Sequence, residues 1–271
     1  MAYRLEKERD TVEASDAMEI RDLSFSYDGR EKVLSHIDLC IPKGKITVLL
    51  GANGCGKTTL FRLMARNLSP DEGEILLGGV RIEELSRKEF ARRAAIVHQS
   101  NTAPPDLCVE TLVGYGRTPY LHAFQSAGSK SDCDAIRWAM ELTDVLKHRK
   151  KMVSELSGGQ RQRVWIAAAL AQETELLMLD EPTSFLDIRY QIELLQLIRR
   201  LNRDYGMTIV MVLHDINQAI RYADEIVGMK DGRITAQGPA EELVTPDFLR
   251  ELYGIALPLT ELSGQKFVLA V

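Results

Sequence analysis

The chain has 271 residues and a formal net charge of −5, because 34 basic side chains are outnumbered by 39 acidic ones. An apolar fraction of 45% supports a sizeable core and, with only 9 prolines and 19 glycines, excludes disordered and collagen-like classes. The acidic balance disfavours nucleic-acid binding, which normally goes with a basic excess.

The N-terminus and the cysteines indicate the compartment. Eight of the first 16 residues are charged, so we expect no secretory signal. No apolar run approaches the roughly 20 residues that a membrane-spanning helix needs. The four cysteines form no CxxC pair. This spacing disfavours a zinc site or a disulfide framework and favours free thiols in a reducing cytosol.

The first part of the chain predicts strands that lead into a glycine-rich loop. We expect residues 1–17, of mixed charge, to form a mobile extension. Strand-like spacing follows over Met18–Phe25 and again over Ile37–Ile41. Ile46–Leu50 is a continuous β-prone run, typical of a buried strand. It leads through the loop into a helical pattern over 60–64.

The sequence pattern of residues 101–157 differs from the preceding alternation of strands and helices and predicts an inserted helical subdomain. A proline-bearing loop over 101–106 precedes two predicted helices, Val109–Arg117 and Asp132–Leu146. A Gly/Ser-containing stretch separates them. The α/β alternation stops before this segment, which is why we interpret it as a helical insert.

The α/β alternation then resumes. Leu176–Leu179 and Thr208–Leu213 predict buried strands. Between them, Asp187–Tyr205 predicts a long amphipathic helix with Ile188, Ile192 and Leu195 on one apolar stripe.

The last part of the chain predicts a hairpin and a small extension. Asp231-Gly232 is a strong turn signal between strands over 225–230 and 233–237. Residues 241–271 then predict short helices and two weak strands that pack on the core. We therefore expect three parts: the mobile extension 1–17, a main domain over 18–240, and this C-terminal extension.

The glycine-rich loop fits G-x-x-x-x-G-K-[ST] at every fixed position. Glycines allow backbone N–H groups to converge on a phosphate, and the following helix adds positive potential at its N-terminus. The lysine would reach the β- and γ-phosphates of a nucleotide, and the threonine after it would ligate Mg²⁺. The residues of this predicted ATP site are Gly51, Ala52, Asn53, Gly54, Cys55, Gly56, Lys57, Thr58 and Thr59.

An acidic pair completes the usual phosphate site. Asp180 and Glu181 follow the buried strand over 176–179. Parallel strands place their carboxyl ends at one edge of a sheet, so this pair is predicted to lie beside the phosphate loop. Asp180 would hold the magnesium ion, and Glu181 would polarise the attacking water.

A second anion site is predicted where Leu156-Ser157-Gly158-Gly159-Gln160 opens a helix. A serine at the N-cap before two glycines leaves helix N–H groups for a phosphate. One chain has no evident need for two such helix ends. Two chains do, because the second site of one could close on the nucleotide bound by the other.

The ordered set of motifs resembles the ATP-binding cassette family over about residues 18–240. The set comprises the phosphate loop, Gln99, the Leu-Ser-Gly-Gly-Gln signature, the acidic strand end, Ser184-Phe185-Leu186-Asp187 and His214. The resemblance implies an α/β fold: a P-loop NTPase (RecA-like) core with an antiparallel β subdomain and an inserted α-helical subdomain.

The resemblance also implies roles at matching positions. Tyr27 would stack on adenine with Val33 beside it, although an aromatic at a strand edge is the plainer interpretation. Gln99 would contact Mg²⁺ and sense the γ-phosphate. His214 would position the water together with Glu181. Residues implied to meet the opposite subunit or its ATP are Ser157, Gly158, Gly159, Gln160 and Asp187.

Cys55 departs from the serine or alanine that is commoner in the family. A small tolerated side chain is one interpretation. The other is a reactive thiol, activated by its place near a helix N-terminus.

Finer cues favour an importer ATPase. Trp165 after the signature, Gly116-Arg117-Thr118-Pro119-Tyr120 in the insert and the residues after His214 resemble the ATPases of ferric-siderophore, haem and cobalamin uptake, siderophores first. The resemblance implies a homodimer, peripheral on the cytoplasmic face of the inner membrane. It also implies an integral membrane permease dimer, gripped near 101–120, and indirectly a substrate-binding protein.

Other functions remain open at this stage. The cargo could be haem, cobalamin or a metal ion. A soluble cassette ATPase acting on nucleic acid usually carries coiled-coil inserts or tandem cassettes, which this chain lacks. A non-hydrolysing regulatory subunit would be expected to lack Glu181 or His214, and both are present. For a small-molecule kinase, the sequence shows no pattern typical of an acceptor site.

Overall fold

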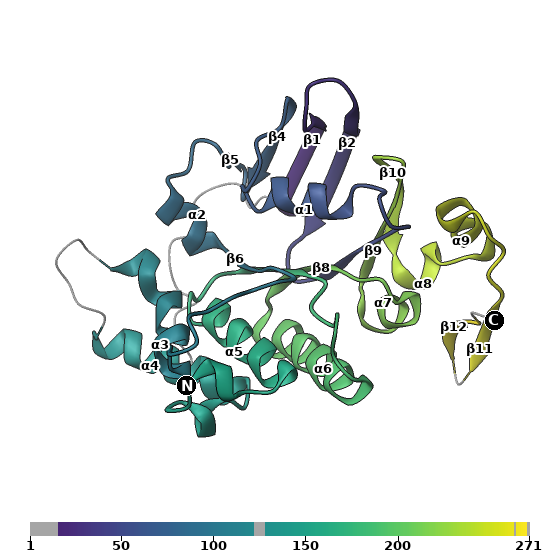
Figure 1. Cartoon of the computed structure of the whole chain (residues 1–271). Helices are drawn as coiled ribbons and strands as arrows, with labels where there is room; N and C mark the ends of the chain where they lie inside the picture. The colour runs from purple at the N-terminus through teal and green to yellow at the C-terminus, as the bar shows by residue number, and fades with distance from the viewer. Residues whose placement is uncertain (1–15, 122–127, 263, 270–271) are drawn as a thin grey trace.

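The computed structural model describes residues 16–121, 128–262 and 264–269. Figure 1 shows a central sheet with an antiparallel sheet and α1 on one side and the helices α5, α6 and α7 on the other. The predicted mobile extension lies mostly outside the described residues. Its last two positions, Asp16 and Ala17, belong to the first strand, so ordered structure begins earlier than Met18.

The central sheet has six strands in the order β10-β9-β3-β8-β7-β6. Neighbouring strands are parallel except for the hairpin of β9 and β10. Every residue of β3, β7 and β8 is buried, as expected for parallel strands covered on both faces. The strands are β3 (Ile46–Leu50), β6 (Ala94–Val97), β7 (Leu176–Asp180), β8 (Thr208–Val212), β9 (Glu225–Lys230) and β10 (Arg233–Pro239).

A four-stranded antiparallel sheet covers one side, in the order β2-β1-β4-β5. Helix α1 (Lys57–Met64) lies between the two sheets and buries Leu60, Phe61, Leu63 and Met64 completely. The helix is therefore fixed from both sides, and with it the loop that precedes it. The strands are β1 (Asp16–Ser26), β2 (Lys32–Pro42), β4 (Glu72–Leu77) and β5 (Val80–Arg81); α2 (Arg87–Arg93) follows.

The helical insert is present, with shorter helices than predicted. The first helix, α3, ends at Gly114 and continues as the 3-10 helix η1, which contains Pro119. The second, α4, ends at Leu142, because Asp144 adopts a left-handed backbone with φ 58°. The elements are α3 (Val109–Gly114), η1 (Tyr115–Tyr120), α4 (Lys130–Leu142), η2 (Leu146–His148) and η3 (Val153–Glu155).

Helices α5 (Gly158–Leu170), α6 (Ile188–Tyr205) and α7 (Ile216–Tyr222) cover the other side of the central sheet (Figure 1). The predicted stripe on α6 is wrong. Ile188 and Ile192 are 68% and 42% exposed, whereas Leu195 is buried. The face that packs on the core contains Leu194, Leu197, Ile198 and Leu201 instead.

Several residues of the C-terminal segment, among them Phe248 and Val268, belong to the core cluster. A hairpin of its last strands contacts α7, where the Asn217 side chain donates to the Val268 carbonyl (3.1 Å) and accepts from the Val268 amide (2.8 Å). No helix in the described ranges is long and apolar enough to cross a bilayer. The C-terminal elements are α8 (Ala240–Leu243), α9 (Pro246–Tyr253), β11 (Leu259–Leu262) and β12 (Gln265–Val268).

Candidate active site

The phosphate loop joins β3 to α1 in a conformation that requires glycine. Gly51, Gly54 and Gly56 all have positive φ, at 157°, 81° and 105°. A Cβ on Gly51 would lie 2.2 Å from the Met229 carbonyl oxygen, so no other residue fits there. Gly56 is the N-cap of α1 and offers no side-chain acceptor. The first N–H groups of the helix are therefore left for an external anion.

Lys57 is buried inside this loop. Its exposed fraction is 5%, and its Nζ donates to the carbonyl oxygens of Gly51 (2.8 Å) and Ala52 (2.9 Å). No carboxylate within the described ranges pairs with it. A buried ammonium whose described partners are two neutral carbonyls and the Cys55 sulfur has a strong electrostatic preference for an anion in the adjoining pocket.

One pocket of about 170 Å³ brings together the phosphate loop, the residues that follow β7 and β8, and the start of β2. It unites segments more than 150 residues apart in the sequence, as the parallel sheet predicts. Its lining consists of Val33, Asn53, Gly54, Gly56, Lys57, Thr58, Thr59, Glu181 and His214.

Glu181 is the centre of a polar cluster at the carboxyl end of β7. One carboxylate oxygen contacts the His214 Nε2 at 2.5 Å. The other accepts from the Gln99 amide (2.5 Å) and from the Ser184 hydroxyl (3.0 Å). Glu181 itself has φ 47°, a strained conformation for a residue with a side chain. The structure therefore brings the three predicted residues Gln99, Glu181 and His214 together.

Asp180 precedes Glu181 and is almost fully enclosed, with 5% exposure. Burial, with the neighbouring Glu181 charge, raises the pKa of Asp180 from 3.8 to about 6. Its Oδ1 atom is buried and has no hydrogen-bond partner among the described residues. A buried carboxylate oxygen without a partner is a suitable ligand for a hard cation.

The predicted adenine residues flank the pocket at its open end. Val33 lines it, and Tyr27 is 58% exposed. The Tyr27 ring packs edge-on against Phe25, with centroids 5.0 Å apart, and its hydroxyl lies 3.3 Å from the Thr59 hydroxyl. An exposed aromatic next to the phosphate loop is available for stacking on a base.

The signature residues occupy a different surface. Ser157 caps α5 by accepting from the Gln160 amide, and Gln160 accepts from the Ser157 amide in return. A Cβ on Gly158 would meet nothing within 4 Å, whereas one on Gly159 would lie 2.7 Å from the Tyr190 ring. None of these signature residues lines the pocket.

Asp187 connects this surface to α6. It is the N-cap of α6, and its carboxylate accepts from the Tyr190 amide at 3.1 Å. Because the Tyr190 ring also packs on Gly159, the signature and the start of α6 form one continuous surface.

The environment of Cys55 favours a packed side chain over a reactive one. The thiol is 5% exposed, belongs to the core between the two sheets and lies 3.7 Å from the Lys57 Nζ. A reagent would have to open the loop to reach it.

Sequence reasoning missed the part played by Ser184. It lies three residues after Glu181, and its hydroxyl fixes the Glu181 carboxylate. The position of a hydroxyl residue just after an acidic strand end is the only sequence signal for that contact.

Comparisons with known proteins agree with this geometry. The ABC transporter family model matches residues 34–184. The iron(3+)-hydroxamate import ATP-binding protein FhuC of Bacillus subtilis is 43% identical and covers 88% of each chain. The ferric enterobactin transport ATP-binding protein FepC of Escherichia coli is also 43% identical, over 86% of this chain and 85% of that protein.

Solved structures agree too. A metal-chelate type ABC transporter in an inward-facing conformation has a TM-score of 0.80 and 26% identity, over 94% of this chain and 96% of that one. A dimeric ATP-binding cassette with ADP and phosphate, in a post-hydrolysis state, has a TM-score of 0.71 and 27% identity, over 82% of this chain and 98% of that one. The chain therefore belongs to the ABC transporter family, as an ATPase that couples ATP hydrolysis to transport.

Proposed function

We propose that this chain is the ATPase subunit of a bacterial importer that takes up ferric-siderophore complexes through a separate membrane permease. The observation that carries the proposal is the set of relatives. Import proteins named for iron hydroxamate, enterobactin and petrobactin are 43–45% identical to it over 86–88% of the chain. The hemin import protein HmuV of Bordetella pertussis is 37% identical over 93% of the chain.

ATP would bind with its phosphates on the loop and its base at Tyr27 and Val33. The N–H groups at the start of α1 and the Lys57 ammonium supply positive potential where the phosphates would lie. Lys57 would exchange its two carbonyl partners for phosphate oxygens, a charge-assisted contact that is stronger than either.

The donor set at the strand end fits Mg²⁺. The Thr58 hydroxyl lines the pocket, and the orphaned Oδ1 of Asp180 is an oxygen ligand, as this hard cation prefers. Gln99 would contribute its amide oxygen. When bound, Mg²⁺ supplies charge neutralisation at the phosphates.

Glu181 would polarise the attacking water. Its carboxylate is held on both sides, by His214 and by Gln99 with Ser184, so its orientation is set before substrate binds. His214 lines the same pocket and would contact the γ-phosphate while holding that carboxylate. Gln99 would couple nucleotide binding to the insert, because the loop after it enters that subdomain.

The second subunit would complete the site. Ser157, Gly158 and Gly159 lie outside the pocket of their own chain, and Gly158 faces open space. In a homodimer the signature helix of one copy would close on the ATP of the other, with Asp187 at the contact. ATP would favour the closed dimer and its products the open one.

We infer a peripheral position on the cytoplasmic face of the inner membrane, in contact with a permease dimer. A substrate-binding protein would deliver the cargo to that permease. The insert exposes large apolar side chains, with Tyr115 and Met152 at 57% and 41% exposure. These are suited to gripping permease loops. We propose no nucleic-acid partner, given the net charge of −5.

Deletion of the gene tests the cargo. The deletion strain should fail to grow on at least one of three iron sources: ferric hydroxamate, an enterobactin-type chelate or a petrobactin-type chelate. Growth with hemin as the iron source should persist. The chain carrying Glu181→Gln is the matched control and should not restore growth. Loss of growth on hemin alone would contradict the siderophore assignment.

A further inference from the structure

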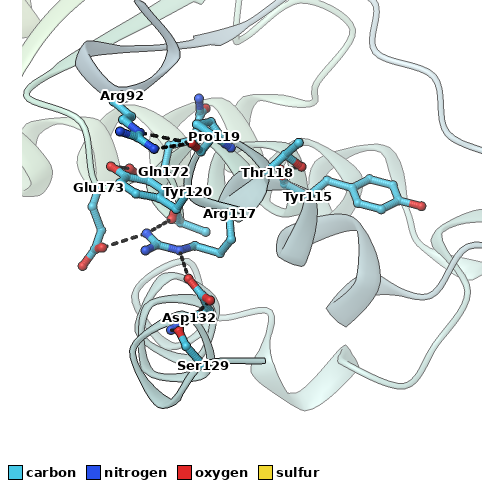
Figure 2. Close-up of polar contacts among 11 residues, drawn as sticks. Arg92, Tyr115, Arg117, Thr118, Pro119, Tyr120, Ser129, Asp132, Gln172 and Glu173 are labelled. Carbon is cyan, nitrogen blue, oxygen red and sulfur yellow. Dashed lines mark hydrogen bonds and ion pairs between the residues drawn. The ribbon is translucent and has the colours of Figure 1, made fainter. Parts of the chain in front are cut away.

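A buried arginine joins two helices of the insert to the segment just past the end of α5. Arg117 in η1 is 3% exposed. Its Nε donates to the Asp132 carboxylate of α4 (2.8 Å). Its Nη1 donates to the Ala171 carbonyl (2.8 Å) and to the Glu173 carboxylate (2.7 Å), just past the end of α5. Figure 2 shows Arg117 between Asp132 and Glu173.

Tyr120 makes a second connection at the same place. Its hydroxyl donates to the Gln172 carbonyl at 2.7 Å. Its ring lies against the Arg117 guanidinium, 4.1 Å from the ring centroid, and Arg92 of α2 contacts the same ring at 5.2 Å. Arg92 also donates twice to the Pro119 carbonyl, as Figure 2 shows. The insert is therefore tied to the core here.

The same cluster grips the C-terminal end of the signature helix. A Cβ on Gly116 would lie 2.1 Å from the Ala168 carbonyl oxygen, so η1 packs directly on the last turn of α5. The Arg117 cation lies at the carbonyl end of this helix, where positive charge is favourable. The opposite end is capped by Ser157, which exchanges hydrogen bonds with Gln160.

Because α5 is long, a small change in its orientation at the C-terminal end would displace its N-terminal end. Thirteen residues at about 1.5 Å each place Ser157 about 20 Å from the cluster. If the grip loosened so that the helix tilted by about 10°, its far end would move by about 3.5 Å. Even about 1 Å of misplacement can cost about 10²-fold in a step that depends on alignment.

We propose that Arg117, together with Tyr120, is a positioning residue that holds the C-terminal end of α5 and thereby sets where Ser157 meets the ATP of a second copy. This inference rests on the proposed function, because it requires the signature to act across a dimer. Arg117 does not line the phosphate pocket of its own chain, so its effect would be on dimer closure and not on nucleotide binding within one chain.

The test measures two quantities in the Glu181→Gln background, which keeps ATP intact. The first is the affinity of the single chain for a fluorescent ATP analogue; the second is the ATP concentration at which half the chain dimerises. Tyr120→Phe removes the hydroxyl that donates to the Gln172 carbonyl. Arg117→Lys keeps the positive charge but removes the guanidinium that bonds Asp132 and Glu173 at the same time. Glu141→Gln is the control, since it alters an exposed α4 carboxylate paired only with Arg137.

Both cluster variants should bind the analogue within twofold of the parent. Tyr120→Phe should raise the dimerisation midpoint about threefold or more and Arg117→Lys about tenfold or more, whereas the control should not change it. Should Arg117→Lys fail to fold, Tyr120→Phe alone decides. An unchanged midpoint in Tyr120→Phe, or a parallel loss of nucleotide affinity, overturns the inference.

A double-mutant cycle with Ser157→Ala separates positioning from general stability. Sites about 20 Å apart normally act independently, so their fold-effects multiply. Positioning through α5 predicts that Tyr120→Phe adds little once Ser157 has been truncated. Full multiplication overturns the inference and leaves the proposed function intact. If Ser157→Ala alone leaves dimerisation unchanged, the proposed two-subunit site is wrong, and the inference falls with it.

Discussion

Asp180→Asn should stabilise the protein in the absence of nucleotide and magnesium. Burial raises the pKa of Asp180 from 3.8 to about 6, so the folded state disfavours its charge. A tenfold change in proton affinity is worth about 1.4 kcal/mol, and the rise therefore costs about 3 kcal/mol of folding free energy at pH 7.5. The neutral amide removes this cost and keeps the shape.

The sign of the pH dependence follows from the same shift. A carboxyl whose folded-state pKa is raised makes its full contribution to the free energy of unfolding below the unfolded-state pKa of 3.8. That contribution is lost as the pH rises through the folded-state pKa of about 6. The advantage of Asp180→Asn should thus be fully present above pH 6 and vanish near pH 4.

The assay is urea unfolding in EDTA at several pH values. Asp144→Asn is the matched control, because a hydrogen bond from Lys147 lowers the pKa of Asp144 and its neutralisation should not stabilise at neutral pH. Asp180→Asn should also abolish magnesium-dependent hydrolysis. An equal or lower free energy of unfolding for Asp180→Asn at pH 7.5 would refute the reasoning.

Three further predictions concern the phosphate loop and the Glu181 carboxylate that we propose to polarise water. Glu181→Gln should keep ATP binding and lower phosphate release by about 10²–10⁴-fold, and normal turnover would contradict its role. Lys57→Ala should raise the Kd of a fluorescent ATP analogue, whereas an unchanged Kd would show that the ammonium does not reach the phosphates. Peptide mapping after alkylation should find Cys55 modified more slowly than exposed Cys133, because its thiol is buried. Faster labelling of Cys55 would revive the reactive-thiol hypothesis.

The sequence predicts the phosphate site well because its determinants are local. Ile46–Leu50 reads as a buried strand whatever its neighbours are, and the glycines that follow are required by the backbone angles of the loop. Sheet topology then brings the end of β7 beside that loop, a general property of parallel sheets that needs no knowledge of side-chain packing.

The packing of helices is harder to predict because it depends on their partners. The period of α6 places Ile188 near its apolar face, but only the observed fold shows which stripe meets the sheet. Arg117 pairs with Asp132 and Glu173, which are 15 and 56 residues away, and nothing in a local pattern announces such contacts.

The structure of the Glu181→Gln chain with ATP and magnesium tests the central claim most directly. Our account predicts two chains face to face, with the Ser157 hydroxyl and the Gly158 amide of each within hydrogen-bond distance of the γ-phosphate that Lys57 of the other chain holds. A nucleotide whose phosphates contact a single chain, with both signatures turned away, would contradict it.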